Sequence, residues 1–211
     1  WMETDLRLTA DGIVVLSHDE DLRRTANDPR AVGEVMWAEL ADLDSGDGRG
    51  FVRLDDALYA HPTMKFNIDL KDSNVVQAAL QTVRDANALE RVRFASFSAR
   101  RLAVLRRQEP RAMTSLGVSD VLGLMLRSEA AVPLPQTRWG WTRGRVDAVQ
   151  VPESYHGVPV VTRRFVASAH TADLEVHVWT VDEPERMRQL ADLNVDAIMT
   201  DVPTLALQTL G

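Results

Sequence analysis

Short β-rich segments alternate with helical segments along most of this sequence. The clearest helical segment carries Val75, Val76, Ala79, Leu80 and Val83, whose spacing places them on one face of a helix. Alternation of this kind is typical of a parallel sheet whose strands are joined by helices. This pattern constrains the fold more than any other feature of the sequence.

The β-rich segments predict the number of strands and the class of sheet. We expect parallel strands at 1–5, 66–71, 92–97, 112–116, 147–151, 176–181 and 196–200. Segment 14–18 lies too close to the first strand for a parallel crossover, which needs about a dozen residues. It is therefore expected to be an antiparallel hairpin arm that turns at Asp11 and Gly12.

Seven strands and an abrupt start together suggest a TIM-like (β/α)8 barrel. The chain begins at Trp1, inside a strand, so we expect the first strand of the barrel to be missing from residues 1–211. An open, doubly wound sheet is the alternative. We expect one barrel domain over 1–211, with the hairpin insertion at about residues 6–50, and a surface loop at 127–146.

Composition excludes several classes of function. The net charge of −7 leaves no basic excess to neutralise phosphates, which argues against a nucleic-acid partner. No apolar run approaches the ~18–20 residues that span a bilayer, so stable membrane insertion is not expected. The absence of cysteine excludes disulfides and thiolate catalysis. No signal peptide pattern is visible, and we expect a cytoplasmic protein.

Acidic residues of one parity mark two of the expected strands. Glu3 and Asp5 project from one face of the first, and Asp69 and Lys71 from one face of the second. Active groups of parallel β/α barrels collect at the C-terminal ends of strands. The three carboxylates therefore predict a site for a hard divalent cation with oxygen ligands. A salt-bridge cluster around Lys71 is the alternative interpretation.

Two further side chains are candidates at the same barrel mouth. His18 ends the hairpin arm, and its place beside the acidic residues favours a functional role over that of an ordinary loop histidine. Trp179 lies near the end of its strand and either lines a pocket or belongs to the core. His177 lies deeper on the same face, where we expect a hydrogen-bonded role in the core.

The run from residue 3 to residue 19, Glu-Thr-Asp-Leu-Arg-Leu-Thr-Ala-Asp-Gly-Ile-Val-Val-Leu-Ser-His-Asp, resembles the glycerophosphodiester phosphodiesterase family. Further matches follow in order along most of the chain, at residues 22–25, 54–58, 67–71, 96–97, 179–182 and 198–203. The resemblance implies a TIM-like barrel with a hairpin insertion after its second strand. The family's opening His-Arg-Gly strand has no counterpart in residues 1–211.

The resemblance also implies roles for individual residues. Glu3, Asp5 and Asp69 match the ligands of a divalent cation, Mg²⁺ or Ca²⁺, and His18 matches the general acid. The third ligand of the family is usually Glu, where this sequence has Asp69.

By the same resemblance, Lys71 contacts the phosphate and Trp179 forms a pocket wall. The implied activity is metal-dependent hydrolysis of small-molecule glycerophosphodiesters, such as glycerophosphocholine, to an alcohol and glycerol 3-phosphate. Two rivals remain open. One is a phospholipase on the same barrel that acts on lysolipids or sphingolipids, and the other is a catalytically inactive barrel used for binding.

Overall fold

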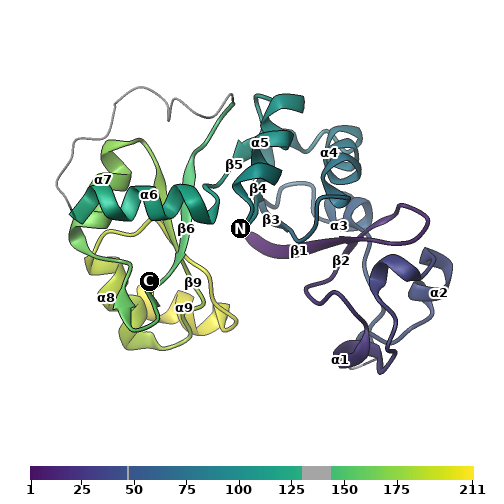
Figure 1. Cartoon of the computed structure of the whole chain (residues 1–211). Coiled ribbons are helices and arrows are strands. Elements are labelled where there is room, and N and C mark those ends of the chain that lie inside the picture. The colour runs from purple at the N-terminus through teal and green to yellow at the C-terminus, as the bar shows by residue number, and fades with distance from the viewer. Residues whose placement is uncertain (47, 130–143) are drawn as a thin grey trace.

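The computed structural model of the chain describes residues 1–46, 48–129 and 144–211 (Figure 1). Its parallel strands follow the segments expected from the sequence. They are β1 (Met2–Leu8), β3 (Phe66–Leu70), β4 (Val92–Ala95), β5 (Met113–Thr114), β6 (Ala148–Pro152), β9 (Glu175–Trp179) and β10 (Ala197–Ile198).

The strands pair in the order in which they occur along the chain. β1, β3, β4 and β5 form one parallel run, and β6, β9 and β10 form another. A parallel bridge between Ser115 and Ala148 joins the two runs. A doubly wound sheet would reverse its strand order part of the way across. The order therefore confirms the TIM-like barrel; among the described residues, no β-pairing joins β10 to β1.

The strand β2 (Val14–Leu16) confirms the predicted hairpin. It pairs antiparallel with β1, so that Leu6 lies opposite Leu16, and Gly12 has the positive φ of 81° that its turn requires. The segment continues through α1 (Arg23–Ala26), the 3₁₀ turn η1 (Val32–Glu34) and α2 (Trp37–Ala41).

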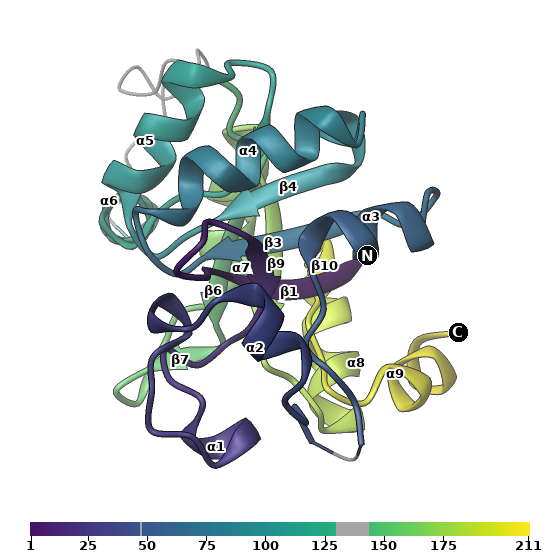
Figure 2. The same cartoon turned by 90° about the vertical axis from the view of Figure 1, so that its right-hand side faces the viewer.

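We call residues 9–53 the arm. It has a small apolar core of its own, formed by the buried side chains of Val15, Leu22, Val32, Val35 and Leu40. In two perpendicular views, α1 and α2 lie on the opposite side of β1 from α4 (Figures 1 and 2). The arm therefore stands beside the barrel and is attached to it through β1 and through Val14, which packs in the barrel core.

The remaining helices surround the strands. They are α3 (Leu54–Ala60), α4 (Val75–Asp85), the 3₁₀ turn η2 (Leu89–Arg91), α5 (Ala99–Gln108), α6 (Val118–Glu129), α7 (Arg163–Thr171), α8 (Pro184–Asp192) and α9 (Pro203–Leu210). A short hairpin of β7 (Ser154–Tyr155) and β8 (Val158–Pro159) precedes α7. No helix in the described ranges has both the length and the apolar character to cross a bilayer.

Side-chain caps fix the starts of three helices. Asp72 accepts the backbone N–H groups of Asn74 and Val75 at the start of α4. Ser98 and Thr162 cap α5 and α7 in the same way, through the N–H groups three residues on. All three caps begin helices that follow strands, so they also set the path of the chain at the barrel mouth.

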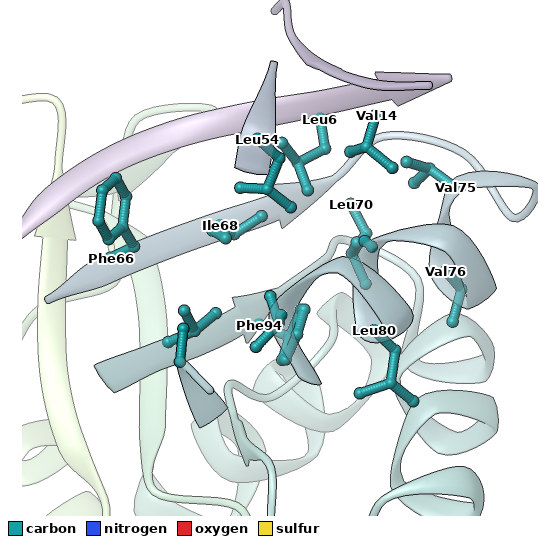
Figure 3. Close-up of a cluster of buried hydrophobic side chains, with 14 of the residues drawn as sticks. Leu6, Val14, Leu54, Phe66, Ile68, Leu70, Val75, Val76, Leu80 and Phe94 are labelled. Carbon is teal, nitrogen blue, oxygen red and sulfur yellow. The ribbon is translucent and has the colours of Figure 1, made fainter. Parts of the chain in front are cut away.

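Apolar packing between strands and helices forms two main cores. In the first, Ile68, Leu70 and Phe94 on β3 and β4 pack against Val76 and Leu80 of α4 (Figure 3). The second joins β6 and β9 to α7 and α8.

The prediction of a surface loop at 127–146 is wrong at its start, because residues 127–129 continue the apolar-faced helix α6. Residues 130–143 of that loop lie outside the described residues. The single domain over 1–211 remains a prediction.

Candidate active site

The register of β1 and β3 brings the acidic residues of the two strands side by side. Glu3 pairs with Asn67, and Asp5 pairs with Asp69. Paired residues on neighbouring parallel strands project from the same face of the sheet. Because Ile68 and Leu70 are fully buried in the outer core, their alternating neighbours Asn67 and Asp69 face the barrel interior.

Lys71 lies between the two aspartates of this pair. Its Nζ is 2.8 Å from Oδ1 of Asp5 and 2.9 Å from Oδ2 of Asp69. The other carboxylate oxygen of Asp69, Oδ1, is buried and has no hydrogen-bond partner among the described residues. A buried carboxylate oxygen without a partner is costly. It therefore marks a place where a ligand would be stabilised.

The electrostatics of the cluster reflect three carboxylates and one nearby ammonium group. Burial, together with the charges of Asp5 and Asp69, raises the pKa of Glu3 to about 7. Burial also raises the pKa of Asp69. The pKa of Lys71 is raised as well, since its hydrogen bonds to the two aspartates outweigh the opposing effect of burial. The site is short of positive charge.

His18 lies on the arm next to this cluster. The backbone N–H of Ser17 donates to the carbonyl oxygen of Asp5 at 3.0 Å, which ties the arm to the inner strand. The charge of His18 acts on Glu3 and lowers its pKa against the larger effect of burial. The imidazole is solvent-accessible, and its Nδ1 lies 2.8 Å from Oδ1 of Asp19. His18 is thus held at the mouth of the barrel by backbone contacts.

An aromatic pair covers another part of the mouth. The rings of Phe97 and Trp179 meet edge to face with centroids 5.8 Å apart. The Lys71 ammonium lies 5.9 Å from the Phe97 ring centroid. These contacts link the ends of β3, β4 and β9. Phe97 is exposed, so the pair offers an apolar surface beside the charged cluster.

The interior below the mouth is polar, whereas most TIM barrels are filled by branched apolar side chains. Arg93 is almost fully buried and bonds the carboxylates of Asp147 at 2.9 Å and Glu175 at 2.7 Å. Its guanidinium also lies 3.1 Å from Nε2 of His177. Burial and the charge of Arg93 lower the pKa of His177. His177 therefore has the hydrogen-bonded core role expected from the sequence.

Whether the residues fit a divalent cation depends on their donors. Glu3, Asp5 and Asp69 offer only carboxylate oxygens, which hard cations prefer, and one buried oxygen of Asp69 has no partner in the part of the chain that the structure describes. Within residues 1–46, 48–129 and 144–211, no three acidic or histidine side chains are gathered closely enough to hold a metal ion. Lys71 bridges the two aspartates instead. The donor chemistry fits a cation, and the present arrangement is a salt-bridge cluster.

A sequentially wound parallel barrel with carboxylates, a lysine and a histidine at its mouth defines a β/α-barrel protein with a charged site at the strand ends. Comparison with known sequences specifies the class. The profile of the glycerophosphoryl diester phosphodiesterase family matches residues 1–205. This chain belongs to that family.

Individual relatives agree with this assignment. The chain is 37% identical, over 203 residues, to a Mycobacterium tuberculosis protein named "Probable glycerophosphodiester phosphodiesterase 2". The matched region covers 95% of this chain and 75% of that protein. It is 24% identical to a glycerophosphodiester phosphodiesterase of Caldanaerobacter subterraneus, in a match that covers 96% of this chain and 82% of that protein.

Solved structures show the same fold. A phosphodiesterase of Oleispira antarctica, solved in complex with the product sn-glycerol-3-phosphate, matches with a TM-score of 0.77 at 18% identity. The match covers 100% of this chain and 84% of the Oleispira chain. A glycerophosphoryl diester phosphodiesterase domain from Mycobacterium tuberculosis has a TM-score of 0.79 at 19% identity, with coverage of 98% and 87%.

The structure brings three of the six predicted site residues into direct contact and relates the other three to them indirectly. Asp5, Asp69 and Lys71 are in direct contact. Glu3 and His18 act on the same cluster electrostatically, and Trp179 reaches it through Phe97.

Sequence reasoning gave no role to several residues at the mouth. Phe97 is one of them, although residues 96–97 are part of the family resemblance. Ser96 and Arg101 are others: both donate hydrogen bonds to the carbonyl oxygen of Leu70, between Asp69 and Lys71. No local pattern marks Arg101, because its contact spans 31 residues.

Proposed function

We propose that this chain hydrolyses glycerophosphodiesters, such as glycerophosphocholine, to an alcohol and glycerol 3-phosphate with the help of a divalent cation. One observation carries the proposal. Asp5 and Asp69 are paired on adjacent strands of a barrel of this family, with Lys71 between them and His18 beside them. This arrangement supports a site in which anionic, cationic and proton-transferring groups act on one substrate.

Glu3, Asp5 and Asp69 would hold the cation. The raised pKa values of Glu3 and Asp69 support this assignment, since burial disfavours their ionised forms and a bound cation would favour them. Mg²⁺ and Ca²⁺ both suit such oxygen donors. When bound, the cation would neutralise negative charge on the phosphate oxygens.

The chain's own residues would perform the other steps. The ammonium of Lys71 would bind an anionic phosphate oxygen, and Trp179 would form a wall of the pocket. As the bond from phosphorus to the leaving oxygen breaks, protonated His18 would give its proton to that oxygen, which leaves as the alcohol. Water would supply the hydroxyl group that ends on phosphorus, and its remaining proton would return to the exposed His18 through solvent, so that the diester plus water gives the alcohol plus glycerol 3-phosphate.

The test is hydrolysis of glycerophosphocholine by the purified chain. We expect turnover to disappear with a chelator and to return when Mg²⁺ or Ca²⁺ is restored. Asp69→Asn should lower turnover by at least ~10²-fold, the scale of a lost charged group at a reacting centre. Asp85→Asn is the matched control, because Asp85 is exposed at the end of α4 and bonds only Gln81 among the described residues.

Three results would contradict the proposal. Activity that is indifferent to chelation would exclude the cation. Hydrolysis of lysophosphatidylcholine in preference to glycerophosphocholine would instead identify a phospholipase on the same barrel, with the Phe97–Trp179 pair as the binding surface of the acyl chain. Absence of hydrolysis for both substrates, with tight binding of either, would identify an inactive binding barrel in which Lys71 keeps its ion pairs.

A further inference from the structure

The arm carries a three-residue chain of contacts that reaches the imidazole of His18. Nδ1 of His18 is 2.8 Å from Oδ1 of Asp19, and the second oxygen of Asp19, Oδ2, accepts a hydrogen bond from Nε of Arg24 at 2.6 Å. Each carboxylate oxygen of Asp19 thus has its own partner. The side chain of Asp19 is 24% exposed, against 66% for His18 and 70% for Arg24, so the carboxylate is the sheltered centre of the chain.

These contacts fix which ring nitrogen of His18 carries the proton. The hydrogen bonds from Arg24 and His18 lower the pKa of Asp19 to about 2, so its carboxylate is ionised at neutral pH and can only accept. Nδ1 must therefore be the donor. The structure gives Nε2 no hydrogen bond among the described residues, and this nitrogen remains available at the barrel mouth.

The residues around Arg24 explain why it reaches back to Asp19. Leu22 is fully buried in the core of the arm, and its backbone N–H donates to the carbonyl oxygen of Arg30 at 3.0 Å. The one-turn helix α1 follows directly and ends at Asn27, which has a left-handed φ of 54°. The buried leucine anchors this turn. The Leu-Arg-Arg-Thr segment at 22–25, which resembles the family but had no role, is thereby connected to the site.

We propose that Asp19 and Arg24 are positioning residues for His18, and that together they hold its imidazole in the tautomer that leaves Nε2 free to transfer a proton. This inference rests on the proposed function, in which His18 protonates the leaving oxygen. Arg7 completes the support from the backbone side, since its guanidinium donates to the carbonyl oxygen of His18 at 3.1 Å. The ring is therefore held through its backbone and through Nδ1.

The position of these contacts argues for a role in catalysis over one in folding. Exposed ion pairs contribute little to folding stability because solvent screens them. Their loss should leave the fold intact and change the orientation of one imidazole. A histidine that acts as a proton donor depends on that orientation.

The decisive experiment compares two substrates that differ only in the leaving group. Glycerophosphocholine releases an alkoxide that must be protonated, whereas the p-nitrophenyl diester of glycerol 3-phosphate releases a phenolate that is stable without a proton. We expect Asp19→Asn and Arg24→Ala to lower kcat for glycerophosphocholine by about 10- to 100-fold, within the range of general acid catalysis. Neither KM nor turnover of the nitrophenyl diester should change appreciably.

Arg23 provides the matched control. It lies next to Arg24 on α1, is equally exposed, and approaches Asp21 at 3.7 Å without reaching Asp19. Arg23→Ala should leave both substrates unaffected. Arg24→Lys, which keeps a cationic donor, should restore part of the lost turnover. Equal losses on both substrates, or no loss on either, would overturn the proposal.

A measurement of the ring itself separates this inference from the proposed function. The ¹⁵N resonances of the His18 side chain should show a protonated Nδ1 in the neutral ring of the wild type, and a mixture of tautomers in Asp19→Asn. A wild-type ring protonated at Nε2 would overturn the inference even in an active enzyme. If the wild type hydrolyses neither diester, the proposed function fails, and the resonances alone then decide on the positioning role.

Discussion

The carboxylate of Glu3 combines access to solvent with a pKa raised to about 7. It lies on β1 two residues before Asp5, where burial and the charges of Asp5 and Asp69 oppose its ionisation. At neutral pH the folded protein must therefore hold this group partly ionised in an unfavourable place. Clustering of like charges at the expense of stability is common where a site is built for a ligand of opposite charge.

Glu3→Gln should make the cation-free protein more stable at alkaline pH. A raised carboxyl pKa means that the folded state binds the proton more tightly than the unfolded state does. Stability from this group is present below the unfolded value near 4.5 and is lost as pH rises through about 7. In the presence of a chelator, we expect the Tm of the variant to exceed that of the wild type by more at pH 8 than at pH 5.

Taking the difference in Tm between the wild type and Glu3→Gln cancels the effects of other groups that titrate in both proteins. His177 has a lowered pKa, and its effect runs the other way, since stability is lost as pH falls below its unfolded value. Both proteins share this effect and that of Asp69. A difference in Tm that stays constant from pH 5 to pH 8 would show that Glu3 is not the destabilising group.

Local signals in the sequence were enough to predict the parallel strands, some of the helices and one face of the site. Side-chain parity placed Glu3 with Asp5, and Asp69 with Lys71, because a strand alternates its faces without help from the rest of the fold. Long-range contacts carry no such signal. The bonds of Arg93 to Asp147 and Glu175 span 54 and 82 residues, and the bridging position of Lys71 depends on how two strands align.

Close packing between elements appears most clearly at Gly117, between β5 and α6. A Cβ atom there would overlap the backbone of Ala99, at the start of α5. The backbone N–H of Val118 donates to the carbonyl oxygen of Phe97 at 3.0 Å across the same contact. The glycine thus lets the β5–α6 connection approach the segment that carries Phe97.

Gly117→Ala should therefore destabilise the protein by about 1–3 kcal/mol, the usual cost of overpacking. Thermal or urea unfolding measures this change. Gly123→Ala is the control, because Gly123 lies within α6 and has open space around its Cβ position. That substitution should be neutral or stabilising by up to ~1 kcal/mol, since alanine favours helix. Equal effects of the two changes would contradict the close contact.

At the scale of the whole molecule, the order of the strands was predictable and the division of the cores was not. Alternating strand and helix signals led to sequential parallel pairing, which the bridge between Ser115 and Ala148 completes. The sequence placed the arm as a hairpin beside the first strand. It did not show that the arm would bury five side chains of its own, because those residues are scattered from Val15 to Leu40.

Catalysis should be lost before the barrel unfolds. The small core of the arm protects fewer apolar groups than either barrel core, so the arm is expected to open in a sub-global transition of lower free energy. In urea, turnover of glycerophosphocholine should fall at concentrations where the far-ultraviolet circular dichroism is still native. Amide hydrogens of Val15 and Val32 should exchange faster than those of Ile68 and Phe94. Coincident transitions would contradict this order.

Because the arm has a core of its own, we expect His18, the proposed proton donor, and the acidic cluster to belong to different cooperative units. His18 is part of the arm, whereas Asp5 and Asp69 lie on barrel strands, and the two units meet through β1 and through Val14 in the barrel core. An equilibrium between docked and undocked arms would therefore act as a reversible on–off control of turnover. The upper temperature at which the protein works would then be set by the docking of the arm, and heating beyond it would leave a dormant, recoverable barrel.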